Sequence, residues 1–525
     1  MTTRRDWLRN VTLGAIGATP GLAGCGWCNV VRTVCASPDS RPSPGSAAAL
    51  VRLVKEAERR HTRIRMTGSG HSFSDVTTTQ TGFLLGPKSL DERLTIDRSR
   101  LRDEGADSPR RDLSLVRTQS GRTIRQLNCD LDELGLAFAN LGGYDAQTIV
   151  GAASTGTHGS GLRFGPITSQ IVSWQVVTAH GEVWQIEPSS GGITDPAHFP
   201  AYLEEDTSIP VKLVQDDAFF DAIGVGIGCL GIVYAVVLKT VPKFWLREER
   251  TKTTWEALTE PTAGFMANLV AHGDANLPSD LQHYEVYFNP YSSKDGTHDA
   301  LLTRRYHLLA DAPGPHERPP AAGWDAVWSW LLTQSEATAL TCGNEAFWQP
   351  LITKAVNDMA CPNYTQVAHR VFHEGFINES KLYAVELAFP FTRTLDVMKR
   401  FLVLAERQAR RYGRCNMGPV TLRFVAPSPA FIAPQQGCTT TMMEIGAPVH
   451  GCRQEALLRT YQAELIELDS SIRPHWGQDL KVLTSERDAL RHWPETWGKW
   501  KAAYARMNES GVFNGDITDR LGMSL

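Results

Sequence analysis

The stretch Arg65-Met66-Thr67-Gly68-Ser69-Gly70-His71-Ser72 decides the fold expected for this chain. The alternating run that leads into it predicts a short strand. Its two glycines allow a tight turn and bring backbone N–H groups close to a bound group, which suits a phosphate. The imidazole of His71 is a nucleophile and hydrogen-bonding group that can lie against a cofactor ring. Taken alone, the motif also fits a glycine-rich surface turn.

A second stretch, residues 142–161, reads GGYDAQTIVGAASTGTHGSG and consists almost entirely of small or hydroxylated residues. So many glycines disfavour the interior of a helix or strand. They favour a loop around a polyanion, because small side chains admit the backbone and Ser and Thr hydroxyls donate hydrogen bonds to oxygens. The sequence therefore predicts a second binding loop.

Together the two stretches resemble the flavoenzymes of the vanillyl-alcohol oxidase fold, with a PCMH-type FAD-binding domain. The chain is most similar to the aldonolactone oxidase (D-arabinono-1,4-lactone oxidase) and alditol oxidase group, from about residue 44 to the C-terminus. The resemblance implies that His71 carries FAD covalently through the 8α-methyl group. It also implies a set of cofactor-binding residues: Gly68, Ser69, Gly70, His71, Ser72, Gly151, Ser154, Thr155, Gly156, Thr157, His158, Gly159, Gly231, Ile232 and Val233.

The expected fold is α+β, with a two-subdomain FAD-binding domain at residues 45–242 and a substrate-binding cap domain at residues 243–525. The cap is expected to be an antiparallel sheet flanked by helices, and its C-terminal segment to return to the FAD domain. Apolar periodicity predicts helices and strands in both domains, at residues 46–60, 123–134, 171–186 (a hairpin), 283–288, 324–332, 346–359, 382–390, 394–412 and 420–425. The glycines at 224–231 precede a strand, which argues against a dinucleotide fingerprint and leaves close strand packing as an alternative.

The N-terminus predicts export. Residues 3–9, TRRDWLR, resemble a twin-arginine signal, and Leu22-Ala23-Gly24-Cys25 resembles a lipobox in which Cys25 is lipidated. The alternative is a cleavable signal in which this cysteine is incidental. We therefore expect a lipoprotein signal at 1–25, a linker at 26–44, and a protein held on the bacterial cell envelope, on the periplasmic or extracellular face, by its lipid alone.

Composition and cysteine spacing bear on three kinds of interaction: nucleic-acid binding, metal binding and disulfide formation. A net charge of −4 over 525 residues, with acids and bases mixed, gives no reason to expect nucleic acid. No metal-type Cys/His spacing is present. An oxidising compartment permits disulfides, and the nearest pairs along the chain are Cys28/Cys35, Cys342/Cys361 and Cys438/Cys452.

The cap domain supplies the candidates for catalysis. By resemblance, Arg423 faces substrate or flavin, and His475-Trp476-Gly477-Gln478 lies beside the isoalloxazine ring. Glu386 is an acid within an apolar strand and needs a partner if it is buried. The structural alternatives are a snorkelling edge arginine for Arg423 and a packed histidine for His475. Two positions depart from the group, because Thr421 stands where glutamate is usual and Gln478 where lysine is usual.

The expected activity is oxidation of a CH–OH group of an aldonolactone or polyol by hydride transfer to flavin N5, with oxygen or another acceptor reoxidising the flavin. Arg423 would stabilise negative charge, His475 would accept or orient a proton, and Glu386 would orient one of these groups. Because Thr421 and Gln478 are uncharged, two alternatives stay open. One is a larger, sterol-like alcohol as substrate, and the other is a lipid-anchored flavin-binding protein without turnover.

Overall fold

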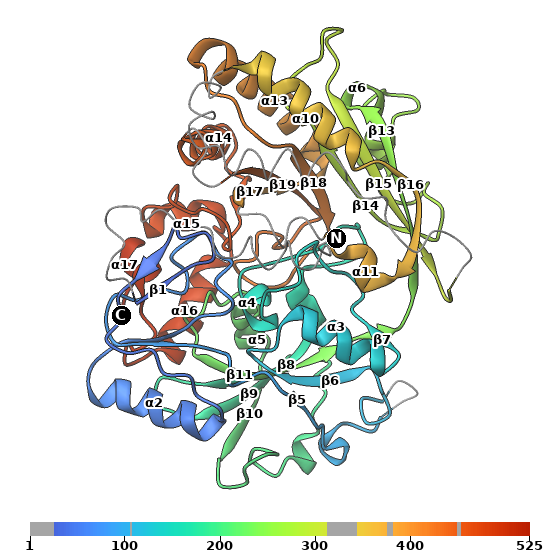
Figure 1. Cartoon of the computed structure of the whole chain (residues 1–525). Coiled ribbons are helices and arrows are strands. Elements are labelled where there is room, and N and C mark those ends of the chain that lie inside the picture. Colours follow the sequence, from blue (N-terminus) through green and yellow to red (C-terminus); the bar gives the residue numbers. More distant parts are fainter. Residues whose placement is uncertain (1–25, 105–107, 312–343, 375–381, 449–452) are drawn as a thin grey trace, which may run out of the picture.

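The computed structural model describes residues 26–104, 108–311, 344–374, 382–448 and 453–525. Two sheet-based halves make up this part of the chain (Figure 1). The half at the bottom of the figure is built mainly from residues before 243, and the large sheet at the top from later residues. This arrangement confirms the α+β class.

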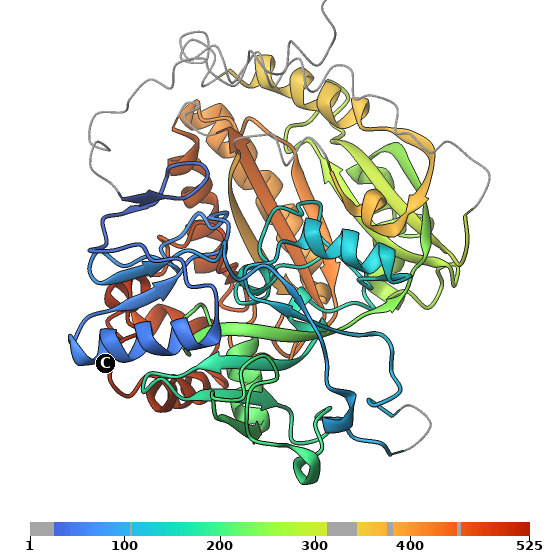
Figure 2. The ribbon, with the colours of Figure 1, turned by 60° about the horizontal axis from the view of Figure 1, so that its bottom comes forward.

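The first half is built on a six-stranded sheet in the order β10-β9-β8-β11-β6-β5. Its helix α2 (Ala47–Arg59) buries Leu50, Val54 and Ala57 in a core shared with β8 and β11, and Figure 2 shows it lying along that sheet. The predicted hairpin is confirmed as the antiparallel pair β8/β9. The other elements are β3 (Ile64–Met66), β4 (Phe83–Leu85), β5 (Arg93–Leu94), β6 (Leu115–Gln119), α3 (Ile124–Glu133), β7 (Leu136–Ala137), β8 (Ile171–Val177), β9 (Val183–Glu187), β10 (Val211–Gln215), α5 (Asp217–Gly224), β11 (Ile232–Lys239) and β12 (Val241–Pro242).

Two segments of this half differ from expectation. The second loop contains a one-turn helix, α4 (Ile149–Ala153), because Ile149, Ala152 and Ala153 can be buried together on it. The segment expected to be a linker, residues 26–44, packs against the first half, where Ser40 forms a parallel bridge with Phe83 of β4. Strands β1 (Trp27–Cys28) and β2 (Cys35–Ala36) form a hairpin closed by a Cys28–Cys35 disulfide. Cys25, Cys342 and Cys452 lie outside the described residues, so the expectations for them stay untested.

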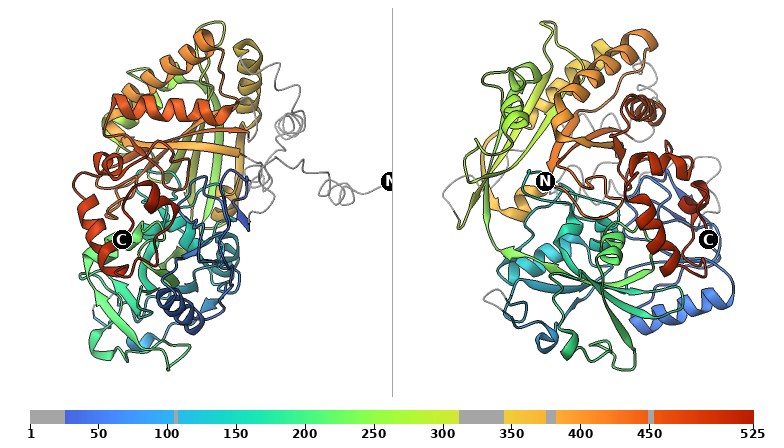
Figure 3. Two further views of the ribbon diagram at one scale, coloured as in Figure 1. Left: turned by 90° about the vertical axis from the view of Figure 1, so that its left-hand side faces the viewer. Right: turned by 180° about the vertical axis from the view of Figure 1, so that it is seen from behind.

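The cap sheet has eight strands in the order β16-β13-β15-β14-β18-β19-β17-β20. Helices α7, α10, α13 and α14 share one hydrophobic core with it, and Figure 3 shows the long helices on its outer side. The predicted helix at 324–332 lies outside the described residues. The cap elements are β13 (Trp245–Thr254), α6 (Trp255–Leu258), α7 (Phe265–His272), β14 (Leu281–Phe288), β15 (Asp299–Leu308), α10 (Glu345–Asp358), β16 (Cys361–Val367), α11 (Ala368–Phe372), β17 (Leu382–Pro390), α13 (Thr394–Tyr412), β18 (Val420–Val425), β19 (Thr440–Pro448), α14 (Gln454–Leu468) and β20 (Arg473–Pro474).

Strict alternation along three central strands separates the two faces of the cap sheet. The helix-side core takes Val385, Leu387 and Phe389 of β17, Val420, Leu422 and Phe424 of β18, and Met443, Ile445 and Ala447 of β19. The residues between them, which include Glu386, Arg423 and Glu444, therefore project from the opposite face.

The C-terminal helices α15 (Glu486–His492), α16 (Trp497–Met507) and α17 (Asp516–Arg520) lie against the first half. Trp500 of α16 shares a core with Ile223 of α5, and Arg520 pairs with Asp75 at 2.6 Å. Figure 3 shows these helices, in dark red, beside the N-terminal residues in blue. Among the helices of the described ranges, none is long and apolar enough to cross a bilayer.

Candidate active site

A cavity of about 320 Å³ lies where the two halves meet, and its lining joins the two glycine-rich stretches to the inner face of the cap sheet. Most of the residues singled out from the sequence line it: Gly68, Ser69, Gly70, His71, Ser72, Gly151, Ser154, Thr155, Thr157, His158, Gly231, Ile232, Val233, Glu386, Arg423, His475 and Gln478. Gly156 and Gly159 do not; Gly156 packs against Pro434, and Gly159 against Asn140.

The two glycine-rich stretches contact each other through backbone. A Cβ on either Gly68 or Gly151 would lie 2.6–2.7 Å from the Thr148 hydroxyl, so a side chain at these positions would collide with it. Gly70 adopts φ of +81°, a conformation that favours glycine. The backbone of both segments can therefore approach a ligand closely from one wall of the cavity.

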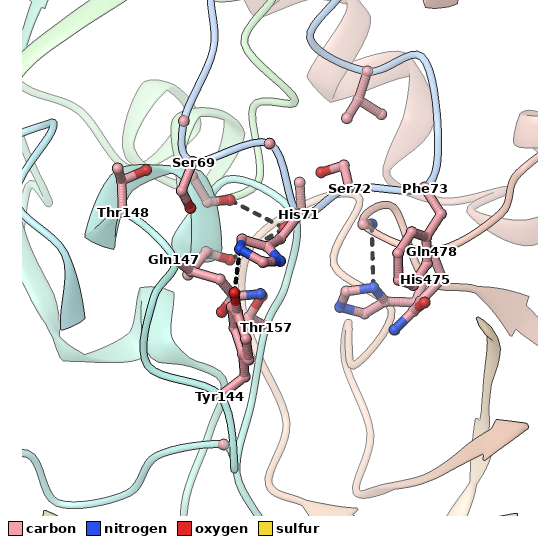
Figure 4. A pocket seen from close by; sticks show the side chains of 18 of the residues that line it. Ser69, His71, Ser72, Phe73, Tyr144, Gln147, Thr148, Thr157, His475 and Gln478 are labelled. Carbon is pink, nitrogen blue, oxygen red and sulfur yellow. Dashed lines mark hydrogen bonds between the residues drawn. The ribbon is translucent and has the colours of Figure 1, made fainter. Parts of the chain in front are cut away.

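His71 is held inside the cavity by Tyr144, whose hydroxyl is hydrogen-bonded to its Nε2 (Figure 4). Burial lowers the pKa of His71 to about 4 and raises the pKa of Tyr144 to about 12. At neutral pH the site therefore presents an uncharged imidazole beside a protonated phenol. Tyr144 was not singled out from the sequence, although it falls inside the second stretch.

The disulfide-closed hairpin covers residues 70–72, the histidine segment that contains His71. The Val30 backbone N–H donates to Gly70 O at 2.9 Å, and the Asn29 side chain donates to Ser72 O at 3.0 Å. Trp27, Val30 and Val31 line the cavity. The hairpin is thus part of the wall.

A row of side chains crosses the inner face of the cap sheet, on the side of the cavity opposite the glycine-rich stretches. Strand register places Tyr287 opposite Thr421, Thr421 opposite Glu444, and Glu444 opposite Glu386. All four line the cavity. Thr421 therefore faces a carboxylate on the next strand.

A chain of ion pairs leads to this row through the sheet. It alternates in sign from Glu374 to Arg250, Glu248, Arg305, Glu285, Arg423 and Glu444, with each contact at 2.6–3.1 Å. Arg423 donates from Nε to Glu285 and from Nη1 to Glu444. Because β18 lies between β14 and β19, Arg423 is not the edge arginine considered as an alternative.

Glu386 is 3% exposed, and its Oε1 lies 3.1 Å from His158 Nε2. The other His158 nitrogen, Nδ1, lies 2.8 Å from the Gly159 carbonyl oxygen. Burial opposes the charge on Glu386, but His158, together with His475 and Arg423, more than offsets this and lowers the pKa of the carboxyl well below its ordinary value. One ligand-type atom from each of His158, Glu386 and His475 lies within 4.8 Å of the others.

The 475–478 segment follows β20. His475 is buried, which lowers its pKa, and its Nδ1 accepts the Gly477 N–H at 3.1 Å. Gln478 donates from Nε2 to Glu444 Oε1 at 3.3 Å. Figure 4 shows His475 and Gln478 across the cavity from His71. The Phe73 N–H donates to Gly477 O at 2.9 Å and links this segment to the histidine segment.

The sequence prediction missed Glu444, Tyr287, Glu285 and Tyr144. Glu444 lies in Thr-Met-Met-Glu-Ile, an acid within an apolar run. The same signal drew attention to Glu386, so it was available for Glu444 as well.

The cavity fits a flavin nucleotide. Ser120 Oγ, Gln147 Oε1 and Gln478 Oε1 line it, are buried, and have no hydrogen-bond partner in the described part of the chain. Buried polar atoms are rarely left unpaired, so these atoms indicate a polar ligand. Glycine backbone on one wall and the hydroxyls of Ser154 and Thr157 nearby suit a pyrophosphate, whereas the Thr155 hydroxyl donates to the Gly151 carbonyl oxygen at 3.1 Å.

Residues 38–187 match the family model for an FAD-binding domain, and residues 236–521 match the model for D-arabinono-1,4-lactone oxidase. The L-gulono-1,4-lactone dehydrogenase of Mycobacterium tuberculosis is 26% identical over 491 residues, which cover 93% of this chain and 96% of that protein. The L-gulonolactone oxidase of Bos taurus is 26% identical over 234 residues, 45% of this chain and 44% of that protein.

Two solved structures are similar in fold. A solvent-stable cholesterol oxidase superposes with a TM-score of 0.66 at 14% identity, over 94% of this chain and 97% of its own. A chitooligosaccharide oxidase superposes with a TM-score of 0.59 at 13% identity, over 99% and 98%. At these identities the likeness concerns the fold alone. The family models decide the assignment: this chain belongs to the D-arabinono-1,4-lactone oxidase family and is an FAD-dependent oxidoreductase that acts on CH–OH groups.

Proposed function

We propose that the protein oxidises a hydroxyl of an aldonolactone or a similar polyol. The observation that carries this proposal is the row of hydrogen-bonding groups, Tyr287, Thr421, Glu444 and Glu386, that faces the cofactor segments across one cavity. A substrate with several hydroxyls needs such a row, because each buried hydroxyl requires a partner.

The sterol-like and non-catalytic alternatives rested on the missing charges at positions 421 and 478. Glu444 places a carboxylate opposite Thr421, and Gln478 binds that carboxylate. A carboxylate therefore lies next to both uncharged positions, which weakens the motive for both alternatives. The relatives named for lactone oxidation or dehydrogenation add support.

Bound FAD would supply the acceptor for a hydride from the substrate carbon. The chain's own residues would hold the substrate C–H toward it and stabilise charge on the neighbouring oxygen. Arg423 is suited to the second task because its guanidinium stays charged and is fixed by two carboxylates. His475 suits orientation better than proton acceptance, since its Nδ1 lone pair already receives the Gly477 N–H.

Covalent attachment of FAD through His71 is part of the proposal. It is supported by the place of His71 on the cavity wall and by the low pKa that keeps its imidazole uncharged, since an uncharged ring nitrogen is a nucleophile. Tyr144 would orient the ring through its hydrogen bond to Nε2.

Export by the twin-arginine route, lipidation of Cys25 and residence on the cell envelope complete the proposal; residues 3–9 and 22–25 support it. Fractionation of cells that express the wild type and Cys25→Ser would test it. Wild type in the membrane fraction and Cys25→Ser in the soluble fraction is the expected result, and equal distribution of both would contradict lipidation.

The test of the activity is anaerobic reduction of the bound flavin. L-gulono-1,4-lactone, D-arabinono-1,4-lactone, xylitol and cholesterol would each be added to the purified protein, and bleaching of the flavin absorbance recorded. We expect at least one lactone or polyol to reduce the flavin faster than cholesterol. Reduction by cholesterol alone would move the substrate to the sterol class, and no reduction by any of the four would favour a binding protein. Admitting air or adding an artificial acceptor afterwards would identify the oxidant.

A further inference from the structure

Two carboxylates line the described part of the cavity, and they differ in their surroundings. Glu386 is 3% exposed, so almost none of its surface is open to the cavity. The side chain of Glu444 is 29% exposed, and because it lines the cavity this surface opens toward a ligand. Glu444 is therefore the carboxylate that a substrate hydroxyl can reach.

The other groups on this wall are poor proton acceptors. Arg423 has no lone pair to offer. Gln478 is an amide, and the Nδ1 lone pair of His475 already receives the Gly477 backbone N–H. Burial, with further contributions from its neighbours, raises the pKa of Tyr287 far above its ordinary value, so the phenol keeps its proton. Glu444 is left as the base of the set.

The charge pattern also favours a proton on Glu444. The ion-pair chain contains four carboxylates, Glu374, Glu248, Glu285 and Glu444, and three arginines. Glu285 lies between two arginines, Arg305 and Arg423, whereas Glu444 stands at the end that opens to the cavity and contacts Arg423. Glu386 lies directly opposite Glu444 on the neighbouring strand, where like charges repel. Burial raises the pKa of Glu444, Arg423 opposes the rise, and Glu386 reinforces it.

We infer that Glu444 accepts the proton of the substrate hydroxyl during oxidation, with Arg423 and Gln478 fixing its carboxylate. The hydroxyl O–H bond breaks and its proton goes to Glu444. The adjacent C–H bond breaks, its electron pair leaves with the hydrogen to the flavin, and the C–O bond becomes a carbonyl. The inference rests on the proposed function and adds a residue that neither the motifs nor the family models single out.

The principal variant is Glu444→Gln, which keeps the shape of the side chain and removes its basicity. We expect the rate of flavin reduction by L-gulono-1,4-lactone or D-arabinono-1,4-lactone, whichever the wild type prefers, to fall by roughly 10²–10⁴-fold. Glu249→Gln is the matched control, because Glu249 is a carboxylate of the same sheet, on β13, that pairs with Arg247 and Arg304 outside the cavity lining. The flavin of Glu249→Gln should be reduced by the lactone at the wild-type rate.

The pH profile separates a base from a residue that only positions Arg423. In the wild type the rate of flavin reduction should rise with pH as Glu444 loses its proton, and in Glu444→Gln this rise should be absent.

Two further measurements test the role of the carboxylate itself. A double variant, Thr421→Glu with Glu444→Thr, moves the carboxylate to the opposite strand, and its rate of flavin reduction should be at least tenfold higher than that of Glu444→Gln. Lactone binding to the dithionite-reduced protein, measured by calorimetry without turnover, should change less than fivefold in Glu444→Gln.

The inference fails if the rate of flavin reduction in Glu444→Gln lies within threefold of the wild-type rate and shows the same pH profile. It also fails if the lost rate is explained by lost lactone binding alone. A wild-type flavin that no lactone or polyol reduces would overturn the proposed function and the role of Glu444 together, which distinguishes that result from a failure of Glu444 alone.

Discussion

The two walls of the cavity are encoded differently. The cofactor wall is formed by two continuous stretches, residues 68–72 and 142–161, in which glycines and hydroxyls act at their own positions. The cap wall is formed mainly by alternate residues of β14, β17, β18 and β19, which meet through strand register, together with the 475–478 segment. A substitution on the cofactor wall should therefore affect its own neighbourhood, whereas a substitution on the cap wall should also affect the other paired charges of the ion-pair chain.

The largest effect is expected at His71. In His71→Ala the flavin should be wholly released into the supernatant after acid precipitation, whereas the wild-type pellet should stay yellow and fluoresce on a denaturing gel. The fold should survive, because residues other than His71 make most of the cavity. Ser72→Ala is the control and should keep the flavin in the pellet. A yellow His71→Ala pellet would contradict attachment at this residue.

The variant Arg423→Ala removes the guanidinium that links Glu285 to Glu444 on the cap wall. We expect the reduction rate to fall by about 10²–10³-fold, because a fixed cation near the reacting oxygen is lost. The free energy of unfolding should also fall by about 3–5 kcal/mol, since Glu285 would be left buried with one arginine fewer. Urea denaturation would measure the second effect.

Arg304→Ala is the control for this prediction, because Arg304 is the neighbour of Arg305 on β15 and is 30% exposed. It should change stability by less than about 1 kcal/mol. A stability loss in Arg304→Ala as large as in Arg423→Ala would contradict a special role for the chain that ends in the cavity.

Glu386 gives a prediction with a defined pH dependence. His158 lowers the pKa of Glu386 in the folded protein, so its contribution to stability is present above its unfolded pKa near 4.5 and is lost as the pH falls below it. Glu386→Gln should lower the free energy of unfolding by about 2–3 kcal/mol at pH 7. The difference from wild type should shrink steadily from pH 5 toward pH 3. A difference that stays constant over this range would show that packing, not ionisation, is affected.

The same contrast explains how far the sequence could be interpreted. Gly68, His71 and Thr155 could be assigned to a cofactor wall because neighbours along the chain are neighbours in space. Strand β17 and its acid could be predicted because Glu386 interrupts a continuous apolar run. The opposition of Glu386 and Glu444 could not, because it depends on β17 pairing with β19, whose sequence positions are separated by helix α13 and strand β18.

Thr421 shows the cost of considering one strand at a time. Its uncharged side chain suggested a lost carboxylate, yet the register places Glu444 directly opposite. The hairpin at residues 27–36 was missed for a different reason. Its short strands carry little periodicity, and it is held by a disulfide and by contacts to residues more than forty positions away, such as that from Asn29 to Ser72.

The smallest effect is expected for that hairpin, which joins the cofactor wall by contacts that are not local in sequence. In Cys28→Ser/Cys35→Ser the closed loop is short, with a sequence separation of 7, so its loss should cost about 2 kcal/mol and should open the hairpin rather than the whole domain. Hydrogen exchange should rise in residues 27–36, and the melting temperature of the whole chain should change little. Cys129→Ser, which removes an exposed cysteine elsewhere in the first half, is the control.

The consequence for the cofactor is visible only when FAD is not covalently held, so the serine pair should be combined with His71→Ala. Because Val30 and Asn29 bind the backbone of residues 70–72, an open hairpin removes part of the wall, and FAD should dissociate several-fold faster. An unchanged dissociation rate alongside faster hydrogen exchange would mean that the two glycine-rich stretches hold the cofactor without the hairpin. The cofactor wall would then be as local as its sequence motifs suggest.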